Sequence, residues 1–387
     1  MRICYVLLSP TFGMHQYTAD LANRLVGDEH DVHLVTTSRA PRDRYTSRVT
    51  IHTPVATTDT GFSRESLRLR AFRRVVRTVL ELRPDVVHLS GPHMWNLLLV
   101  KALKAQSIPV AHSIHDLDPH VGSGYGFLLR IWNYLVLRSV DHILVHGETY
   151  RDRLLAQGIG PEQITLTPLL HLFVGGAWLE MYSDLAAATE YQPWALFFGR
   201  LKRYKGLEYL LTACAMMDGA NDTRGRIVVA GHGDISALWA GSLPDRLALH
   251  NGLINDEEAM DLFSRCGLLV LPYTDATQSA LIAAAYYFRK AVIVTRTGAL
   301  PEYVVDGETG YVIEPDHPAA LARVLVELLD DPQSLRRMGE AGRAWYDERR
   351  SEEQEALLYM YRGLMASSPS QEEVTTEGVM ERDHGYQ

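Results

Sequence analysis

Residues 268–302 read LLVLPYTDATQSALIAAAYYFRKAVIVTRTGALPE, the pattern of a strand, a loop, a helix and a second strand. The apolar run 268–271 ends at a proline, the polar turn 273–279 follows, and the alanine-rich segment 280–290 contains neither glycine nor proline. The β-branched run 291–295 closes the unit, which is typical of a parallel sheet with ligands at the carboxyl edge of its strands. Backbone amides at 278–280 would then be open to a phosphate, although an ordinary buried crossover helix capped by Ser279 fits this segment equally well.

Composition places the chain among ordinary globular proteins. It has 387 residues, more than one hydrophobic core usually holds, so two domains are expected. Hydrophobic residues make up 47% and charged residues 22% of the chain. The net charge of -9 argues against a general nucleic-acid-binding protein.

Cysteine use and hydropathy indicate a cytoplasmic protein. Cys4, Cys214 and Cys266 are far apart in apolar surroundings, which is typical of buried thiols rather than of a disulfide or metal site. The opening segment MRICYVLLSP lacks the apolar region and cleavage site of a signal peptide. No continuous apolar segment of the sequence is long enough for a membrane-spanning helix.

The alternation of strands and helices extends outward from 268–302 over most of the chain. About six such units fill residues 2–157, and the alternation begins again at residue 195 after an irregular stretch. The first turn, at 10–13, lacks the GxGxxG pattern of a dinucleotide site. We therefore predict an α/β protein with two Rossmann-like domains. The predicted divisions are an N-terminal domain at 1–172, a connection at 173–193, a C-terminal domain at 194–345, helices crossing back at 346–366 and a disordered acidic tail at 367–387. The last two helices before this tail are expected at about 335–349 and 353–365.

A strongly basic helix is predicted at 64–83. Eleven arginines stand between residues 39 and 83 against four acidic residues, and apolar side chains recur at helical spacing within the helix. A solvated charged face is the usual meaning of such a pattern. The alternative is docking to an anionic surface, such as a layer of lipid headgroups.

Two cations follow the first strand of the second half, in the segment FFGRLKRYKG. Arg200 and Lys205 would stand at the carboxyl end of that strand and face the edge that carries Thr277 to Ser279. An arginine fork and a lysine point charge near unpaired amides suit a diphosphate.

Five motifs then occur in order: GRLKRYKG, VVAGHGD, HNGLI, LPYTDATQS and TGALPEYVVDGETGYV. Together they resemble the C-terminal domain of the family 4 retaining glycosyltransferases of the GT-B fold, over about residues 190–345. The N-terminal half resembles the family less closely, through the glycine turn at Gly13 and the segment SIHDLDPH.

The resemblance implies a nucleotide-sugar cleft between two Rossmann-like domains. Arg200 and Lys205 would hold the diphosphate, and His115 would lie near the transferred sugar as the third catalytic residue. The expected donor-binding residues are Gly231, Gly233, Gly252, Leu253, Ile254, Tyr273, Thr277, Gln278, Ser279, Ala280 and Glu302. On the acceptor side we expect Gly13, His15 and Asp116.

The sequence departs from the family at the Glu-x7-Glu motif, whose second glutamate binds the ribose. Alignment on the following strand places Ala276 and Ala284 at these positions, in a subgroup with a DATQS loop. Tyr273, Asp275, Thr277 or Glu302 could compensate for the missing carboxylates. The loss also motivates two alternatives: a non-catalytic GT-B protein that binds a sugar nucleotide for a partner, and a GT-B sugar-nucleotide epimerase.

No metal is expected. The histidines of AHSIHDLDPH, together with Asp116 and Asp118, have suitable ligand types but lack a helical i, i+4 pair. The DxD at 116–118 matches the metal motif of GT-A transferases, but the βα alternation on both sides of the cleft argues against that fold.

The sequence therefore predicts transfer of a hexosyl group from a nucleoside diphosphate sugar, with a UDP-sugar favoured, to a hydroxyl group with retention of configuration. The two cations and the loop amides would neutralise the leaving diphosphate. The acceptor would be a saccharide, a lipid-linked saccharide or a small metabolite, in polysaccharide, glycolipid or glycosylated-metabolite biosynthesis. Neither a cofactor nor a nucleic acid is implied, and peripheral contact with an anionic membrane at its inner face is the remaining partner hypothesis.

Overall fold

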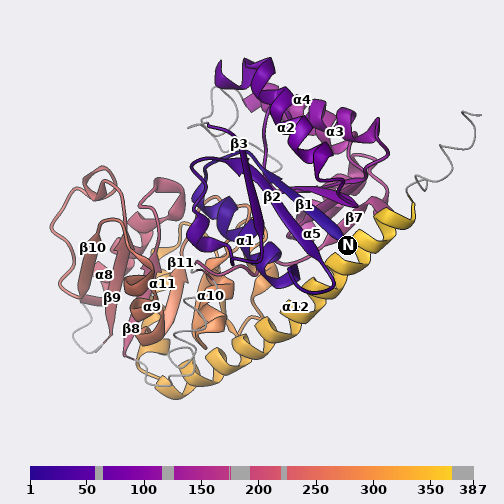
Figure 1. Ribbon diagram of the computed structural model, residues 1–387. Helices are drawn as coiled ribbons and strands as arrows, with labels where there is room; N and C mark the ends of the chain where they lie inside the picture. Colours follow the sequence, from indigo (N-terminus) through magenta and orange to yellow (C-terminus); the bar gives the residue numbers. More distant parts are fainter. Residues whose placement is uncertain (57–63, 116–125, 174, 176–191, 219–224, 368–387) are drawn as a thin grey trace, which may run out of the picture.

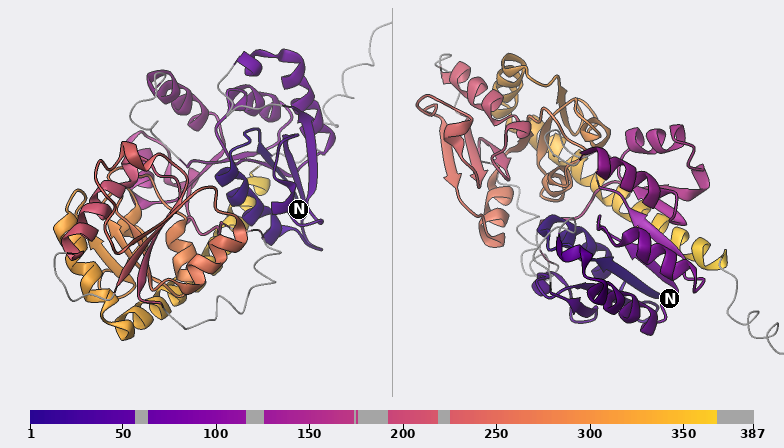
Figure 2. Two further views of the ribbon diagram at one scale, coloured as in Figure 1. Left: turned by 90° about the vertical axis from the view of Figure 1, so that its left-hand side faces the viewer. Right: turned by 90° about the horizontal axis from the view of Figure 1, so that it is seen from above.

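The computed structural model describes residues 1–56, 64–115, 126–173, 175, 192–218 and 225–367. Two lobes, each built on a parallel sheet, lie side by side, and one long helix runs along both of them (Figure 1, Figure 2). Two predicted segments, the connection 173–193 and the tail 367–387, fall almost wholly outside the described residues. Asp116 and Asp118 of the histidine-rich segment also lie outside them.

The N-terminal sheet has, within the described residues, seven parallel strands in the order β3-β2-β1-β4-β5-β6-β7. Its central strands are buried, mostly apolar runs, as expected when helices cover both faces, and the edge strands are mostly half-buried. The strands are β1 (Arg2–Leu7), β2 (Asp31–Thr37), β3 (Thr50–Val55), β4 (Val86–Leu89), β5 (Val110–Ser113), β6 (His142–Val145) and β7 (Ile164–Leu166). The helices are α1 (Phe12–Leu25), η1 (Arg42–Arg44), η2 (Arg64–Leu67), α2 (Leu69–Glu81), α3 (Asn96–Lys104), α4 (Gly126–Leu137), α5 (Glu148–Ala156) and η3 (Pro161–Gln163).

The C-terminal sheet has six parallel strands in the described part of the chain, in the order β10-β9-β8-β11-β12-β13. The strands are β8 (Trp194–Phe198), β9 (Arg226–Gly231), β10 (Leu247–Asn251), β11 (Leu268–Leu271), β12 (Ala291–Thr295) and β13 (Gly310–Ile313). The helices are η4 (Arg203–Lys205), α8 (Leu207–Asp218), η5 (Ile235–Ala237), α9 (Asp256–Arg265), α10 (Leu281–Tyr287), η6 (Leu300–Tyr303), α11 (Pro318–Leu329) and α12 (Pro332–Ala366). The unit at 268–302 thus occupies the middle of this sheet, and two Rossmann-like domains confirm the predicted α/β class.

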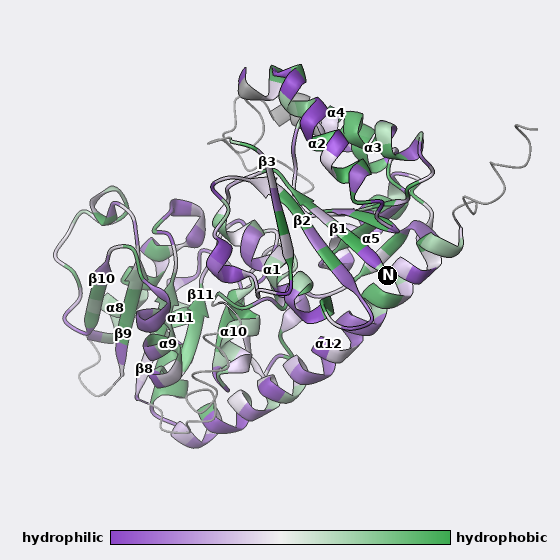
Figure 3. Cartoon of the chain, viewed as in Figure 1, coloured by the Kyte–Doolittle hydropathy of each residue, from purple (hydrophilic) through white to green (hydrophobic). Residues whose placement is uncertain are grey.

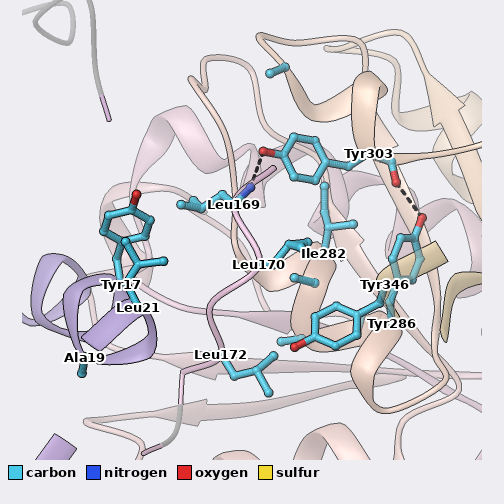
Figure 4. Packing of buried hydrophobic residues seen from close by; sticks show 14 of the residues in the cluster. Tyr17, Ala19, Leu21, Leu169, Leu170, Leu172, Ile282, Tyr286, Tyr303 and Tyr346 are labelled. Atoms are coloured by element: carbon cyan, nitrogen blue, oxygen red, sulfur yellow. Dashed lines mark hydrogen bonds between the residues drawn. The ribbon is translucent and has the colours of Figure 1, made fainter. Parts of the chain in front are cut away.

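One apolar core crosses the domain boundary. It combines residues of α1, the segment after β7, α10, η6 and α12 (Figure 4). Tyr303 ties the domains together, because its hydroxyl donates to the carbonyl of His146 at 2.5 Å and accepts the amide of Leu169 at 2.8 Å. The two domains therefore share one buried apolar core. Each sheet also has a core of its own on its outer face.

Helix α12 differs from the prediction of separate helices at 335–349 and 353–365. It is a single helix of 35 residues, which begins beside β12 and ends over the N-terminal sheet. Ser351 resembles the cap of a new helix, but its hydroxyl instead donates to the carbonyl of Asp347, one turn back in the same helix. Because its buried residues recur along the whole length, packing against both domains keeps the helix continuous.

Other differences lie at the ends of elements. The basic segment begins with the short η2 turn, so its α-helix, α2, covers only Leu69–Glu81. Gly13, expected in a turn, lies in the first turn of α1. The edge strands β7 and β13 were not predicted, since they are only three and four residues long and are mostly half-buried. No helix of the described residues combines the length and apolar character needed to cross a membrane.

Replacing Arg350 of α12 by methionine should destabilise the protein by about 3 kcal/mol, because the carboxylates of Asp20 and Glu353 would then share Arg24 as their one cation. Arg350 donates to Asp20 of α1 at 2.8 Å and to Glu353 at 3.0 Å, and Glu353 is only 2% exposed. Arg24 of α1 donates to the same Glu353 oxygen at 2.8 Å. The free energy of unfolding in denaturant would measure the loss.

Arg349 provides the matched control for this substitution. It stands next to Arg350 on the same helix but pairs with Glu352 on the surface, so Arg349→Met should change stability by less than about 1 kcal/mol. Equal losses in the two variants would contradict the assignment of this network to the attachment of α12.

Candidate functional site

A cleft of about 990 Å³ lies between the two domains, at the carboxyl edges of both sheets. Its walls come from the loop after β1 and the start of α1, from η1, from the end of β5, and from the loops after β8 and β11. The site residues predicted from the sequence that line it are Gly13, His115, Arg200, Lys205, Ile254, Tyr273, Thr277, Gln278, Ser279 and Ala280. The fold therefore brings together residues that are up to 267 positions apart, from Gly13 to Ala280.

The cations of the C-terminal domain stand at one end of this cleft. Lys205 donates from Nζ to the hydroxyl of Tyr273 at 2.7 Å and lies 4.6 Å from the centre of its ring. Arg200 is exposed and forms no hydrogen bond or ion pair with the described residues. One guanidinium group and one positioned ammonium group are thus available to an anion in the cleft.

Gly206 explains how Lys205 reaches Tyr273. The backbone φ of Gly206 is 64°, a left-handed conformation that favours glycine. A Cβ atom at this position would lie 1.8 Å from the carbonyl oxygen of Pro272. The start of α8 can therefore pack directly on the loop after β11, which brings the η4 turn and its lysine to the ring of Tyr273.

The loop before α10 presents backbone donors to the same space. Within the described residues, no acceptor is found for the amides of Gln278, Ser279 and Ala280, and Ser279 is only 8% exposed. The helix that follows is shorter than predicted, seven residues at Leu281–Tyr287 instead of 280–290. The amides of the loop itself, more than the dipole of a long helix, therefore make this wall attractive to an anion.

His115 lies on the opposite wall, at the end of β5. Its ring stacks on that of His146 with the centres 5.3 Å apart, and the ring of Tyr17 meets it edge-on at 4.6 Å. The side chain of Gln278 donates across the cleft to the backbone carbonyl of His115 at 3.1 Å. This hydrogen bond joins the loop of the C-terminal domain to the N-terminal wall.

An ion pair that the sequence analysis missed bridges the cleft. Arg44 of η1 binds both carboxylate oxygens of Asp256 at the start of α9, at 2.5 and 3.1 Å. The guanidinium group of Arg44 also lies 4.8 Å from the ring centre of Phe12 and 3.4 Å from a carboxylate oxygen of Asp43. The only local signal was the NDEE start of α9, which indicates a helix cap and does not predict a partner in the other domain.

Five of the predicted donor-binding residues, Glu302 among them, lie outside this cleft. Gly252 and Leu253 line a neighbouring pocket of about 490 Å³, which Ile254 shares with the cleft. Gly231 and Gly233 instead allow close approach of two backbone segments. A Cβ atom on Gly231 would lie 1.9 Å from the carbonyl oxygen of Gly199, and one on Gly233 would lie 2.5 Å from that of Leu201.

Two predictions need correction, and one cannot be examined. Glu302 was expected to contact the donor, but its carboxylate accepts the amides of Glu148 and Thr149, at 2.5 and 3.1 Å, at the start of α5. Free helix amides attract a carboxylate strongly, so Glu302 joins the domains instead of lining the cleft. His15 points into the N-terminal core, where its Nδ1 and the hydroxyl of Tyr45 are 2.8 Å apart. Asp116 lies outside the described residues.

No group of three or more potential metal ligands is found within the described residues. The cleft instead offers a guanidinium group, an ammonium group and backbone amides on one wall, and rings and polar groups on the other. This arrangement can hold an anionic leaving group opposite a second, less charged molecule.

Comparison with known proteins identifies two domains. Residues 12–169 match the family described as "Glycosyl transferase 4-like domain", and residues 186–345 match "Glycosyl transferases group 1". A curated relative, the D-inositol 3-phosphate glycosyltransferase of Streptomyces avermitilis, is 25% identical over 85% of this chain and 78% of its own length.

Solved structures share the fold of the whole chain. The sucrose-phosphate synthase of Thermosynechococcus elongatus has a TM-score of 0.71 at 20% identity and covers 95% of this chain and 100% of its own. The Anabaena protein Alr3699/HepE in complex with UDP has a TM-score of 0.69 at 15% identity and covers 93% of this chain and 99% of its own.

Proposed function

From the finding that the chain is a GT-B glycosyltransferase, with a glycosyl transferase 4-like domain followed by a group 1 domain, we propose its reaction. The protein transfers a hexosyl group from a UDP-sugar to a hydroxyl group, with retention of configuration. One observation carries the proposal. Arg200, Lys205 and the amides of 278–280 converge on one end of a cleft large enough for a nucleotide sugar and an acceptor. Such a set of donors would stabilise a diphosphate as its negative charge develops in the transition state.

The donor would lie along the C-terminal wall. The pocket formed by Gly252, Leu253 and Ile254 adjoins the cleft through Ile254 and would take the base. The diphosphate would lie against the two cations and the loop amides. The hexosyl group would then point toward His115 on the N-terminal wall. The UDP complex of the Anabaena structure supports a uridine donor.

The charges in the cleft support retention by attack on the same face of the sugar. Among the described residues, Asp43 and Asp256 are the carboxylates that line the cleft, and both are paired with Arg44. Since Arg44 holds both carboxylates, we assign neither of them as a nucleophile. The acceptor hydroxyl would attack the anomeric carbon from the side of the departing diphosphate, whose oxygen takes the hydroxyl proton. No metal is needed, because Arg200 and Lys205 supply the positive charge.

The acceptor would enter along the N-terminal wall. Thr11, Phe12 and Gly13 at the start of α1 combine an apolar ring with exposed polar groups beside His171. A saccharide, a lipid-linked saccharide or a small metabolite fits this chemistry. We therefore place the protein in polysaccharide, glycolipid or glycosylated-metabolite biosynthesis.

Addition of UDP should raise the melting temperature of the purified protein. A ligand at a hundred times its dissociation constant stabilises the folded state by about 2.7 kcal/mol, which corresponds to several degrees for domains of this size. A panel of UDP, GDP, ADP and TDP with their sugars, followed by thermal unfolding, would make the measurement. Uridine without phosphates serves as the control and should produce a much smaller shift. The absence of a shift with every nucleoside diphosphate would contradict the proposed donor site.

A further inference from the structure

The helices α2, α3 and α4 form one layer over the outer face of the N-terminal sheet. They enclose the core made of Val75, Val79, Leu99, Leu103 and Val136, among others. The opposite face of this sheet is covered by α1 and the end of α12, so the layer is remote from the helix that joins the domains. Its solvent side therefore belongs to the N-terminal domain alone.

Exposed apolar side chains gather on this solvent side. On α4, residues Ile131, Tyr134 and Leu135 recur at the i, i+3, i+4 spacing of one helix face, and each is more than 40% exposed. Leu98 occupies the exposed side of α3 at 46%. Leu67, the last residue of η2, and Leu69, the first residue of α2, are 68% and 65% exposed. These exposed residues do not belong to the core, because the inward-facing residues of the same helices already fill it.

Arginine side chains lie between these exposed apolar residues. The exposed residues of α2 are Leu69, Arg70, Arg73, Arg74 and Arg77, opposite the buried Val75 and Val79, and a single acidic residue, Glu81, at the C-terminal end of the helix. Together with Arg68, these arginines form no hydrogen bond or ion pair with the residues that the structure describes. Neither α3 nor α4 contains an acidic residue. Figure 3 shows hydrophobic and hydrophilic residues next to one another along these helices. We name this surface the outer helical face.

The outer helical face consists of Leu67, Arg68, Leu69, Arg70, Arg73, Arg74, Arg77, Leu98, Lys101, Ile131, Tyr134, Leu135 and Arg138.

We propose that the outer helical face docks on an anionic lipid bilayer. Apolar side chains interleaved with unpaired arginines match the interface of such a bilayer, where acyl chains and negative headgroups lie within a few ångströms of each other. Tyr134 strengthens the match, since a tyrosine places its ring among acyl chains and its hydroxyl among headgroups, and Arg138 lies 4.7 Å from the centre of that ring.

A small cavity adjoins the arginines of this surface and is a candidate anion site. It measures about 60 Å³ and is lined by Arg68, Arg74, His93 and Trp95, at the start of α2. A lipid phosphate would find two guanidinium groups there. Because all strands of the sheet are parallel, the start of α2 lies at the same edge as the cleft. The docked face would therefore present a lipid-borne acceptor near the cleft. This consequence rests on the proposed function, whereas the docking itself does not.

Co-sedimentation of the full chain with vesicles tests the proposal without any donor or acceptor. The protein should bind vesicles of phosphatidylglycerol mixed with phosphatidylcholine and should remain in solution with phosphatidylcholine alone. Changing Arg70, Arg73 and Arg74 to glutamine should weaken partition about fivefold per arginine. The double variant Leu69→Ser, Ile131→Ser should bind at low ionic strength but lose binding at physiological ionic strength, where screening leaves the apolar contacts dominant.

A matched control has the same loss of charge on the C-terminal domain. Arg226, Arg336 and Arg337 are exposed, and their change to glutamine should leave vesicle binding unaltered. Equal loss in both triple variants, or no binding of the wild-type chain to anionic vesicles at low ionic strength, would overturn the proposal. Light scattering adds a second test. A dimer that Leu69→Ser, Ile131→Ser dissociates, without vesicle binding by the wild type, would assign the face to a second copy of the chain instead.

Discussion

Alanine at Arg200 or at Lys205 should lower kcat/KM for sugar transfer by about 100-fold to 1,000-fold, the effect of removing one donor that stabilises a developing oxyanion. Both side chains line the cleft at the end where the loop amides of 278–280 lie. Arg200 has no partner among the described residues, so its removal should leave stability nearly unchanged. Lys205 has the hydroxyl and ring of Tyr273 as partners, and its loss should cost the fold little, since this contact is only partly buried.

Initial rates with saturating acceptor and varied donor would measure the effect, and denaturant unfolding would show that the fold is intact. Lys202→Ala is the matched control. Lys202 is an exposed lysine of the same loop that does not line the cleft, so its loss should leave the rate within about twofold of wild type. Tyr273→Phe should have an intermediate effect, because Lys205 keeps the ring but loses the hydroxyl that positions it. Full rates in both Arg200→Ala and Lys205→Ala would show that the diphosphate binds elsewhere.

The sequence predicted the fold class because the signals for buried parallel strands are strong. The run at 268–271 and the next strand, β12, are fully buried, and buried parallel strands appear as continuous apolar segments. The edge strands β7 and β13 gave no such signal, since they are short and mostly half-buried. Helix α12 was divided incorrectly because its continuity depends on packing against both domains, which a local pattern at Ser351 does not contain.

For the site, too, local motifs predicted some residues, but contacts between the two domains could not be predicted. Arg200, Lys205 and the loop at 277–280 were predicted because each follows a strong strand in a motif of fixed spacing. The pair formed by Arg44 and Asp256 was missed, since its two members lie in different domains and 212 positions apart. Glu302 was misassigned for the same reason. Its motif suggested the cleft, but the amides at the start of α5 are its partners, and only the packing of the domains reveals them.

A cluster of buried histidines makes the N-terminal domain sensitive to acid. Burial lowers the pKa of His15, His112 and His171 to about 4 and that of His88 to about 3. His88 is enclosed between the hydroxyls of Tyr361 and Ser113, at 2.6 and 2.7 Å, and His112 has the carbonyl of Leu89 as its partner at 2.8 Å. These rings stay neutral in the folded protein at a pH where the unfolded chain already binds protons.

The direction of the effect follows from this difference in proton binding. Above about pH 6.5 neither state is protonated at these histidines, and the stability is fully present. As the pH falls from there toward about 4, the unfolded state takes up protons that the folded state does not, so stability decreases by about 1.4 kcal/mol per pH unit for each histidine. Four such groups acting together should remove several kcal/mol by about pH 5, a large part of the 5–15 kcal/mol that is usual for a folded protein.

Denaturant unfolding at a series of pH values would measure this decrease. The slope of the free energy of unfolding against pH gives the number of histidines that titrate. His112→Asn keeps a side-chain amide that can donate to the carbonyl of Leu89 but removes one titrating group. The variant should lose some stability at neutral pH, yet its stability should fall less steeply with acid, by about 1.4 kcal/mol per pH unit. His250→Asn changes an exposed histidine of the C-terminal domain and should leave the slope as in the wild type. A wild-type stability that stays constant from neutral pH to about pH 5 would contradict the buried neutral state of these histidines, because the linkage between proton binding and folding requires the decrease.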